Sequence, residues 1–168
     1  MTASNEYKPQ LLNCQSVEEA ASMLRELPRA WKTTHRREYL QGDGVETWLE
    51  FEYRTWALGE GLRQVLPLKK NWKQSSELWD VVAKIAEDRE LRHGSQPYFE
   101  LLARYGGTKH HQVLLSGLDN ECVQGHAVKA LRIAGVVGAE ERVAKIQSSA
   151  RHAWVRREAK KYLAKVGA

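Results

Sequence analysis

The carboxy-terminal third of the chain repeats itself, and this repeat constrains the fold more than any other feature. Segment 123–135 aligns with segment 155–167 at a spacing of 32 residues. The coinciding pairs are Val123 with Val155, Ala127 with Ala159, Lys129 with Lys161, Leu131 with Leu163 and Gly135 with Gly167. An internal period of roughly 20–50 residues is typical of stacked repeats, in which each unit buries its apolar face against its neighbours. Such stacks usually bind other molecules, so we expect a binding protein.

Apolar residues recur at three- and four-residue steps along most of the chain, which is the period of an α-helix. Ser16 with Glu19 forms a capping box that begins the first helix. Pro28 is expected to end it, because proline lacks the amide hydrogen that a helix interior needs. No segment shows convincing strand alternation, so the predicted fold class is all-α. The expected helices cover 16–27, 45–64, a segment from 75 or 76, a segment from 97 to 105, 109–117, 121–134, 139–148 and 153–166.

The helix expected over 45–64 has the clearest apolar stripe. The stripe consists of Val45, Trp48, Leu49, Tyr53, Trp56 and Ala57. Three tryptophans on apolar stripes are interpreted as core residues, namely Trp48, Trp56 and Trp79. Three glutamates are interpreted as a solvated face, with a catalytic carboxylate as the alternative, namely Glu46, Glu50 and Glu52.

The chain of 168 residues has the length of one domain, and 42% hydrophobic residues suffice for a core. We expect a single all-α domain over 1–168. Within it, residues 1–15 form an arm and residues 16–74 form divergent helices rich in tryptophan. Residues 75–168 form about three helix pairs, covering roughly 75–105, 108–135 and 139–167.

The repeated segment resembles a known family at specific positions. The pattern D-x-x-x-V-x-x-x-A-x-x-A-L-x-x-x-G is found at Asp119, Val123, Ala127, Ala130, Leu131 and Gly135. It resembles a HEAT repeat, and the second copy fits with Tyr162 in place of the second alanine. The resemblance covers about residues 108–168. It implies a short right-handed α-solenoid of antiparallel helix pairs, with Gly135 and Gly167 in left-handed conformation at helix ends.

The resemblance also implies the kind of function to expect. HEAT-like stacks mostly bind proteins, on a concave surface lined by the second helix of each pair. Some bacterial members are adaptors or immunity proteins that inhibit a cognate toxin. Others bind DNA, including alkylpurine DNA glycosylases with HEAT-like repeats. We therefore expect a non-enzymatic protein-binding module, with a nucleic-acid-binding protein related to those glycosylases as the alternative.

Composition narrows the setting of the protein. The net charge is +5, which permits an acidic partner. Cys14 and Cys122 are the only cysteines and lack zinc-like spacing, so we read them as free thiols in a reducing compartment. The sequence has neither an apolar leader after a basic start nor a stretch of about 18 apolar residues. We expect a cytoplasmic protein that does not enter a membrane.

Cations gather near the end of the chain. Between Arg142 and Lys165 there are eight lysines and arginines and one acidic residue, Glu158. Arg156, Arg157, Lys160 and Lys161 spread around the open side of the last expected helix. They serve either as the polar outer face of an end cap or as a binding patch for an acidic partner. Lys129 and Arg132, on the preceding repeat helix, join them as candidate binding residues.

Aromatic residues next to cations form a second group of candidates. Lys70, Trp72 and Lys73 lie in a basic loop, where we expect an exposed aromatic binding site. Trp31 and Trp154 also have basic neighbours. Such pairs can stack nucleobases while the charges hold phosphates, although tryptophans of this kind are more often part of the core.

Catalytic and cofactor motifs are weak. The six histidines contain neither H-E-x-x-H nor any His-Glu dipeptide, so we expect no metal site. The glycine pairs at 42–44 and 59–61 lack the residues of a phosphate-binding loop. Cys122 precedes His126 by four residues on one helix face, which is suggestive of a nucleophile but common by chance. We expect no enzyme and no cofactor.

Overall fold

The computed structural model describes residues 6–34, 39–40 and 48–167. These residues are almost entirely helical, which confirms the predicted all-α class. The helices are α1 (Lys8–Asn13), α2 (Val17–Thr34), α3 (Glu50–Val65), α4 (Ser76–Glu87), α5 (Gln96–Leu101), α6 (His111–Ser116), α7 (Gln124–Ala134), α8 (Glu140–Ser149) and α9 (Ala153–Val166). Short 3-10 segments at Lys70–Gln74, Arg89–Ser95, Thr108–His110 and Gly117–Asp119 connect them, and a π-helical turn at Leu102–Gly106 extends α5.

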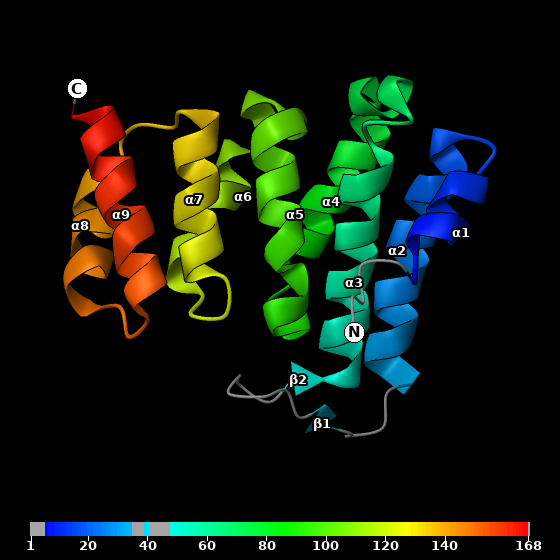
Figure 1. The fold of residues 1–168 in the computed structure, drawn as a ribbon, viewed down its shortest axis with the longest axis horizontal. Coiled ribbons are helices and arrows are strands. Elements are labelled where there is room, and N and C mark those ends of the chain that lie inside the picture. Colours follow the sequence, from blue (N-terminus) through cyan, green and yellow to red (C-terminus); the bar gives the residue numbers. More distant parts are fainter. Residues whose placement is uncertain (1–5, 35–38, 41–47, 168) are drawn as a thin grey trace.

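The helices form two layers. Figure 1 shows α3, α5, α7 and α9 side by side in the nearer layer, with α4, α6 and α8 behind them. Within the nearer layer, α5 packs against α3 and α7, and α9 packs against α7. Between the layers, α8 packs against α9 and α6 against α7, while α2 packs against both α3 and α4. The core therefore continues from one end of the row of helices to the other.

The repeated residues form the core at the carboxy-terminal end. Val123, Ala127 and Leu131 are at most 1% exposed, and Ala159 and Tyr162 are fully buried. The alanines let neighbouring helices approach closely, while the larger side chains fill the layer between them. Tyr162 keeps its hydroxyl satisfied by donating to the carbonyl of Val136 at 2.9 Å. Leu163, which coincides with Leu131 in the repeat, is only partly buried.

The two glycines that end the repeated segments differ. Gly135 has φ 69° and ψ 29°, which is the left-handed conformation expected for it. Gly167 has φ −86° and ψ −3°, so the same expectation is wrong there. The amide of Val136 donates to Leu131, which turns the chain toward α8 after Gly135.

Pro28 does not end the first long helix, so that prediction is wrong. Helix α2 continues through Pro28 to Thr34. Tertiary contacts hold the part beyond the proline: the Trp31 ring lies 5.3 Å from the Tyr7 ring, and the Lys32 ammonium is 2.9 Å from the Asp88 carboxylate. These contacts offset the hydrogen bond that proline cannot make.

Helix α3 begins later than its apolar stripe suggested. Residues 41–47 lie outside the described part, and Trp48–Leu49 form a short strand, β2. It pairs antiparallel with β1 (Tyr39–Leu40), with Tyr39 opposite Leu49 and Leu40 opposite Trp48. The helical prediction for residues 48 and 49 is therefore wrong. The main chain turns into the helix at Leu49, whose amide donates to the Glu52 carboxylate at 2.6 Å.

Two predicted helix starts are confirmed with their caps. Ser75 precedes α4, and its hydroxyl accepts a hydrogen bond from the Leu78 amide at 3.2 Å. Ser16 precedes α2 and accepts from the Glu19 amide at 3.2 Å. The returning bond of this second cap differs from the usual pattern, since the Glu19 carboxylate accepts from the amide of Gln15.

Candidate binding groove

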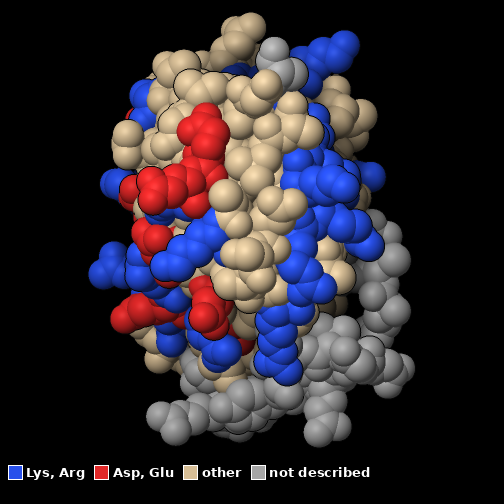
Figure 2. Space-filling view, turned by 90° about the vertical axis from the view of Figure 1, so that its left-hand side faces the viewer, with Lys and Arg blue, Asp and Glu red and all other residues tan. Residues whose placement is uncertain are grey.

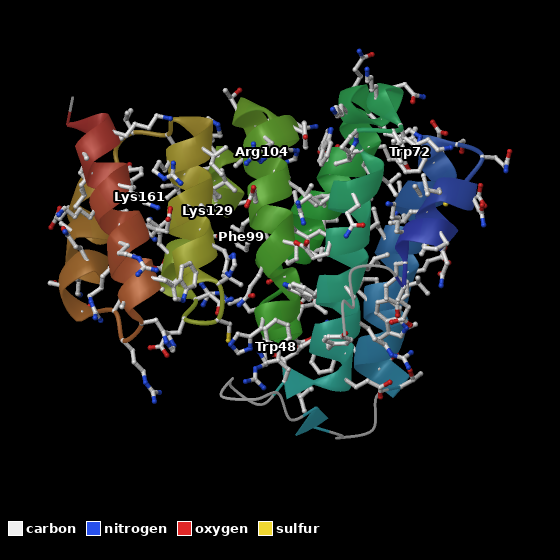
Figure 3. The ribbon with its side chains drawn as sticks, in the orientation of Figure 1. Trp48, Trp72, Phe99, Arg104, Lys129 and Lys161 are labelled. Atoms are coloured by element: carbon white, nitrogen blue, oxygen red, sulfur yellow. The ribbon has the colours of Figure 1, made fainter. Side chains whose placement is uncertain are left out.

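A groove crosses the amino-terminal ends of α5, α7 and α9 beside strand β2. Its first cavity has a volume of about 810 Å³. The lining is Trp48, His93, Gln96, Glu121, Cys122, Gly125, His126, Lys129, His152, Trp154, Val155, Arg157 and Glu158. Figure 3 shows Trp48 below α5 and Lys129 on α7, on the side of the molecule formed by the nearer layer. Four segments distant in sequence therefore build one site.

A second cavity of about 630 Å³ extends the groove toward the turn that precedes α9. It shares His93, Glu121, Cys122, His152 and Val155 with the first cavity. Its further lining residues are Arg92, Gln124, Ser149, Ala150 and Arg151. The first cavity is thus the more aromatic part of the groove, and the second is the more polar part.

Two tryptophans line the first cavity from different segments. Trp48 stacks on the ring of His93, with centroids 5.2 Å apart and an interplanar angle of 16°. Trp154 is 36% exposed and lies edge-on to His126 at 5.0 Å. Large aromatic side chains held by their neighbours can bury much area of a partner at low entropic cost. The core assignment of Trp48 is wrong, because this residue is only half-buried and lines the cavity.

Gly125 makes the position of Trp154 possible. A Cβ atom at residue 125 would lie 2.3 Å from Cη2 and 2.6 Å from Cζ3 of Trp154. Any side chain larger than hydrogen must therefore push the indole out of place. Glycine inside a helix costs up to about 1 kcal/mol relative to alanine, and here it lets α9 and its tryptophan lie directly on the α7 main chain.

The wall formed by His93 is held in place by a buried carboxylate. Glu52 on α3 is fully buried, and its Oε1 lies 3.0 Å from His93 Nδ1. It also accepts hydrogen bonds from the amides of His93 and Leu49. Burial raises the pKa of Glu52, but the hydrogen bonds and the Arg92 guanidinium outweigh it, so the pKa lies below its ordinary value. The prediction that Glu52 belongs to a solvated face is wrong.

Arg92 has an uncommon backbone conformation next to this carboxylate. Its φ of 49° and ψ of −125° make it the one non-glycine residue with positive φ in the described part of the chain. Its Nε lies 3.5 Å from the Glu52 carboxylate, and its carbonyl accepts from the Ser95 hydroxyl. A non-glycine residue in such a conformation costs about 1–3 kcal/mol and persists only when its surroundings fix it.

Two predicted binding cations pair with acids of neighbouring helices. The Lys129 ammonium lies 2.6 Å from the Glu100 carboxylate, which links α7 to α5. Arg132 lies 3.0 Å from Glu158, which links α7 to α9. Burial raises the pKa of both glutamates, but their cationic partners lower it by a larger amount. Both pKa values therefore lie below the ordinary value. Lys129 still lines the first cavity, whereas Arg132 does not.

The predicted cations of α9 divide into groups with different surroundings. Arg156 donates to the carbonyls of Ala150 and Arg151, and Lys161 lies 2.7 Å from Glu158. Arg157 lines the first cavity, while Lys160 is exposed outside it. Figure 2 shows the end of the molecule formed by α8 and α9, with lysines and arginines along one side and mixed charges on the other. Of these four residues, only Arg157 belongs to the groove.

The basic loop does not form an exposed aromatic site, so that prediction is wrong. Trp72 is 2% exposed, and Figure 3 shows it near the upper edge of the molecule, beside α1. The 3-10 segment that carries it turns the indole inward, because removing its apolar surface from water is favourable. Lys70 is exposed, and Lys73 lies over the Tyr105 ring at 5.2 Å. None of these three residues lines the groove.

The groove also contains a histidine with a strongly shifted pKa. Burial, followed by the nearby Lys129 charge, lowers the pKa of His126 to about 4. His126 is therefore neutral at pH 7, as a residue that packs against an indole edge should be. Cys122 lies in the same groove and is half-buried. The described residues include no group of three or more histidine, cysteine or acidic side chains placed to hold a metal ion.

His126 should make stability depend on pH. In the unfolded chain its pKa is about 6.5, so on acidification the unfolded state binds a proton before the folded state does. We expect this residue to remove up to about 3 kcal/mol from the unfolding free energy as the pH falls from about 7 to about 4. Urea unfolding across this range should show a flatter profile for His126→Gln than for the wild type. Parallel profiles would contradict the assignment.

Comparisons with known proteins found no family model, no curated protein and no solved structure that matches the chain. The described part of the chain contains no helix with the length and apolar character needed to cross a membrane.

Proposed function

We propose that the protein is a non-enzymatic helical-repeat module that recognises a protein partner through the groove. In this proposal the two layers form a short right-handed α-solenoid of antiparallel, HEAT-like helix pairs. The layer of α3, α5, α7 and α9 is then its concave side. A small bacterial adaptor, or an immunity-type inhibitor that binds a toxin, would be built in this way.

The groove is the observation that carries the proposal. Its first cavity of about 810 Å³ has room for side chains of an inserted loop or extended segment. The aromatic side chains in its walls have defined positions. Glu52 hydrogen-bonds His93, and the absence of a side chain at Gly125 leaves room for the Trp154 ring. A preformed surface loses little ordering entropy on binding. The aromatic lining favours a partner segment that inserts an apolar or aromatic side chain.

The charges of the groove favour protein over nucleic acid. Glu121 is exposed and lines the first cavity, where it would repel a phosphodiester backbone. Several cations predicted from sequence are held by acids or carbonyls of the protein itself, such as Lys129, Arg132 and Arg156. A partner with one or two acidic side chains beside an apolar one fits this mixed lining better than a continuous polyanion does.

Selection from a random peptide library against the full chain tests the proposal. We expect recovered peptides to share an apolar or aromatic residue, and to bind Gly125→Ala at least about tenfold more weakly, since the new methyl displaces Trp154. The Gly125→Ala substitution should cost about 1–3 kcal/mol of unfolding free energy. Peptide binding by this variant is therefore measured under conditions where circular dichroism shows it folded. Lys160→Ala, on α9 outside the cavities, is the matched control and should bind like the wild type.

Two results would overturn this proposal. One is that the library yields no peptide above background. The other is that the selected peptides bind Gly125→Ala and wild type equally well. Salt-sensitive binding of single-stranded or duplex DNA, with contacts in the groove and no selected peptide, would favour the nucleic-acid alternative instead.

A further inference from the structure

The second cavity has a different chemistry from the first. Arg92 and Arg151 both line it, one from the segment before α5 and the other from the turn before α9. Gln124 and Ser149 add neutral polar groups, and the indoles of Trp48 and Trp154 do not reach it. Two guanidinium groups around a polar cavity are the usual chemistry for recognising a carboxylate or phosphate.

The backbone of Arg92 supports a role beyond packing. Glycine would adopt φ 49° without the cost that arginine pays there. The Arg92 side chain is 43% exposed, and its contact with Glu52 is long, at 3.5 Å from Nε. The buried carboxylate also accepts a hydrogen bond from the neighbouring amide of His93. The strained conformation therefore places Arg92 at the cavity, where its guanidinium lies beside the Glu52 carboxylate and stays partly exposed.

Two acidic residues near this cavity bear on whether it can bind an anion. Glu52 is buried and has hydrogen bonds from Leu49 and His93. Glu121 is exposed and lines both cavities, so its charge opposes an anion in either of them. Helix α9 begins at the cavity with neither a side-chain cap nor an acidic residue in its first turn, which adds to the positive potential of the two arginines.

We propose that the second cavity is an anion subsite that takes the carboxylate of an aspartate or glutamate of the protein partner. This inference rests on the proposed function, since the carboxylate belongs to the segment whose apolar side chain occupies the first cavity. Arg92 and Arg151 bind its two oxygens, and Glu121 limits the number of acidic residues that the groove accepts.

The peptides selected against the full chain provide the probe. We expect an acidic residue at a fixed distance from the shared apolar residue. Replacing it with its amide should weaken binding at least about tenfold, as loss of a charge-assisted pair does. Arg92→Gly and Arg151→Gln should weaken the acidic peptide in the same way and leave the amide peptide nearly unchanged. Arg89→Gln, an exposed arginine of the same 3-10 segment outside the cavity, is the matched control.

The sign of the Glu121 effect gives an independent test. Glu121→Gln should tighten the acidic peptide, because a negative charge at the edge of the cavity is removed. Arg92→Gly relieves the backbone cost but removes the Arg92 contact with the buried Glu52 carboxylate, so its binding is compared with the wild type under conditions where circular dichroism shows both proteins folded.

Different failures can be told apart. Peptides that need Trp154 but carry no acidic position, or that bind Arg92→Gly and wild type equally, overturn the subsite and leave the groove proposal standing. Weaker binding of the acidic peptide to Glu121→Gln also overturns the subsite. Failure to select any peptide overturns both proposals.

Discussion

Replacing Glu52 with alanine should cost about 3–5 kcal/mol of unfolding free energy, the usual effect of removing one member of a buried charged pair. The carboxylate receives hydrogen bonds from the amides of Leu49 and His93 and lies beside the His93 ring and the Arg92 guanidinium. Truncation removes the fully buried acceptor and leaves the amides of Leu49 and His93 without their hydrogen-bond partner. Denaturant unfolding at pH 7 measures the loss.

The comparison with a neighbouring glutamate makes this test specific. Glu50 pairs with Arg54 on the partly exposed side of the same helix, so Glu50→Ala should cost at most about 1 kcal/mol. The Glu52 effect should also depend on pH. Its folded pKa is lowered, so its stabilisation is present above the unfolded pKa of about 4.3 and is lost as the pH falls through the folded pKa. Equal costs for the two substitutions at pH 7 would contradict the role assigned to Glu52.

The second large effect is expected where Phe99 meets Gly117. Phe99 on α5 is 1% exposed, and Figure 3 places it between α5 and α7. A Cβ atom at Gly117 would lie 2.4 Å from Cε1 of Phe99 and 2.8 Å from Cβ of Ala127. Phe99→Ala should cost about 3–5 kcal/mol through the cavity it leaves, and Gly117→Ala about 1–3 kcal/mol through overpacking.

A double-mutant cycle tests whether these two effects share one cause. Phe99→Leu removes ring atoms that face Gly117, so Gly117→Ala should cost less in that background than in the wild type. Thermal or urea unfolding of the four proteins gives the coupling energy. If the costs of the two substitutions are additive, the Phe99 ring is not the reason why alanine destabilises position 117.

The carboxy-terminal fold was predictable because its signals are local. The spacing of Val123, Ala127 and Leu131 gives a helical face, and Gly135 marks where α7 ends. Ser75 and Pro97 mark helix starts by chemistry that acts within one turn. Pro28 misled for the opposite reason, since contacts of Trp31 and Lys32 with distant residues continue the helix beyond it.

The groove was largely hidden because its residues meet only in three dimensions. Glu52 and His93 are 41 positions apart, and no helical pattern connects them. Periodicity placed Glu52 on an outer face, although the segment before α5 covers that face in the folded protein. Trp154 was noted for its basic neighbours, whereas Gly125 offered the one local signal, a glycine inside a helix, that another main chain or ring lies close.

The row of packed helices also has a consequence for how the chain acquires its structure. The strong contacts of the carboxy-terminal half join α5 to α7, α7 to α9 and α8 to α9, elements that follow one another closely along the chain. At most one further α-helix lies between the partners of each contact, so the chain segments that must close are short and little chain entropy is lost, and such local contacts favour fast folding. Synthesis from the amino terminus can then add each pair to a surface that has already formed, and the groove is completed last, when α9 docks.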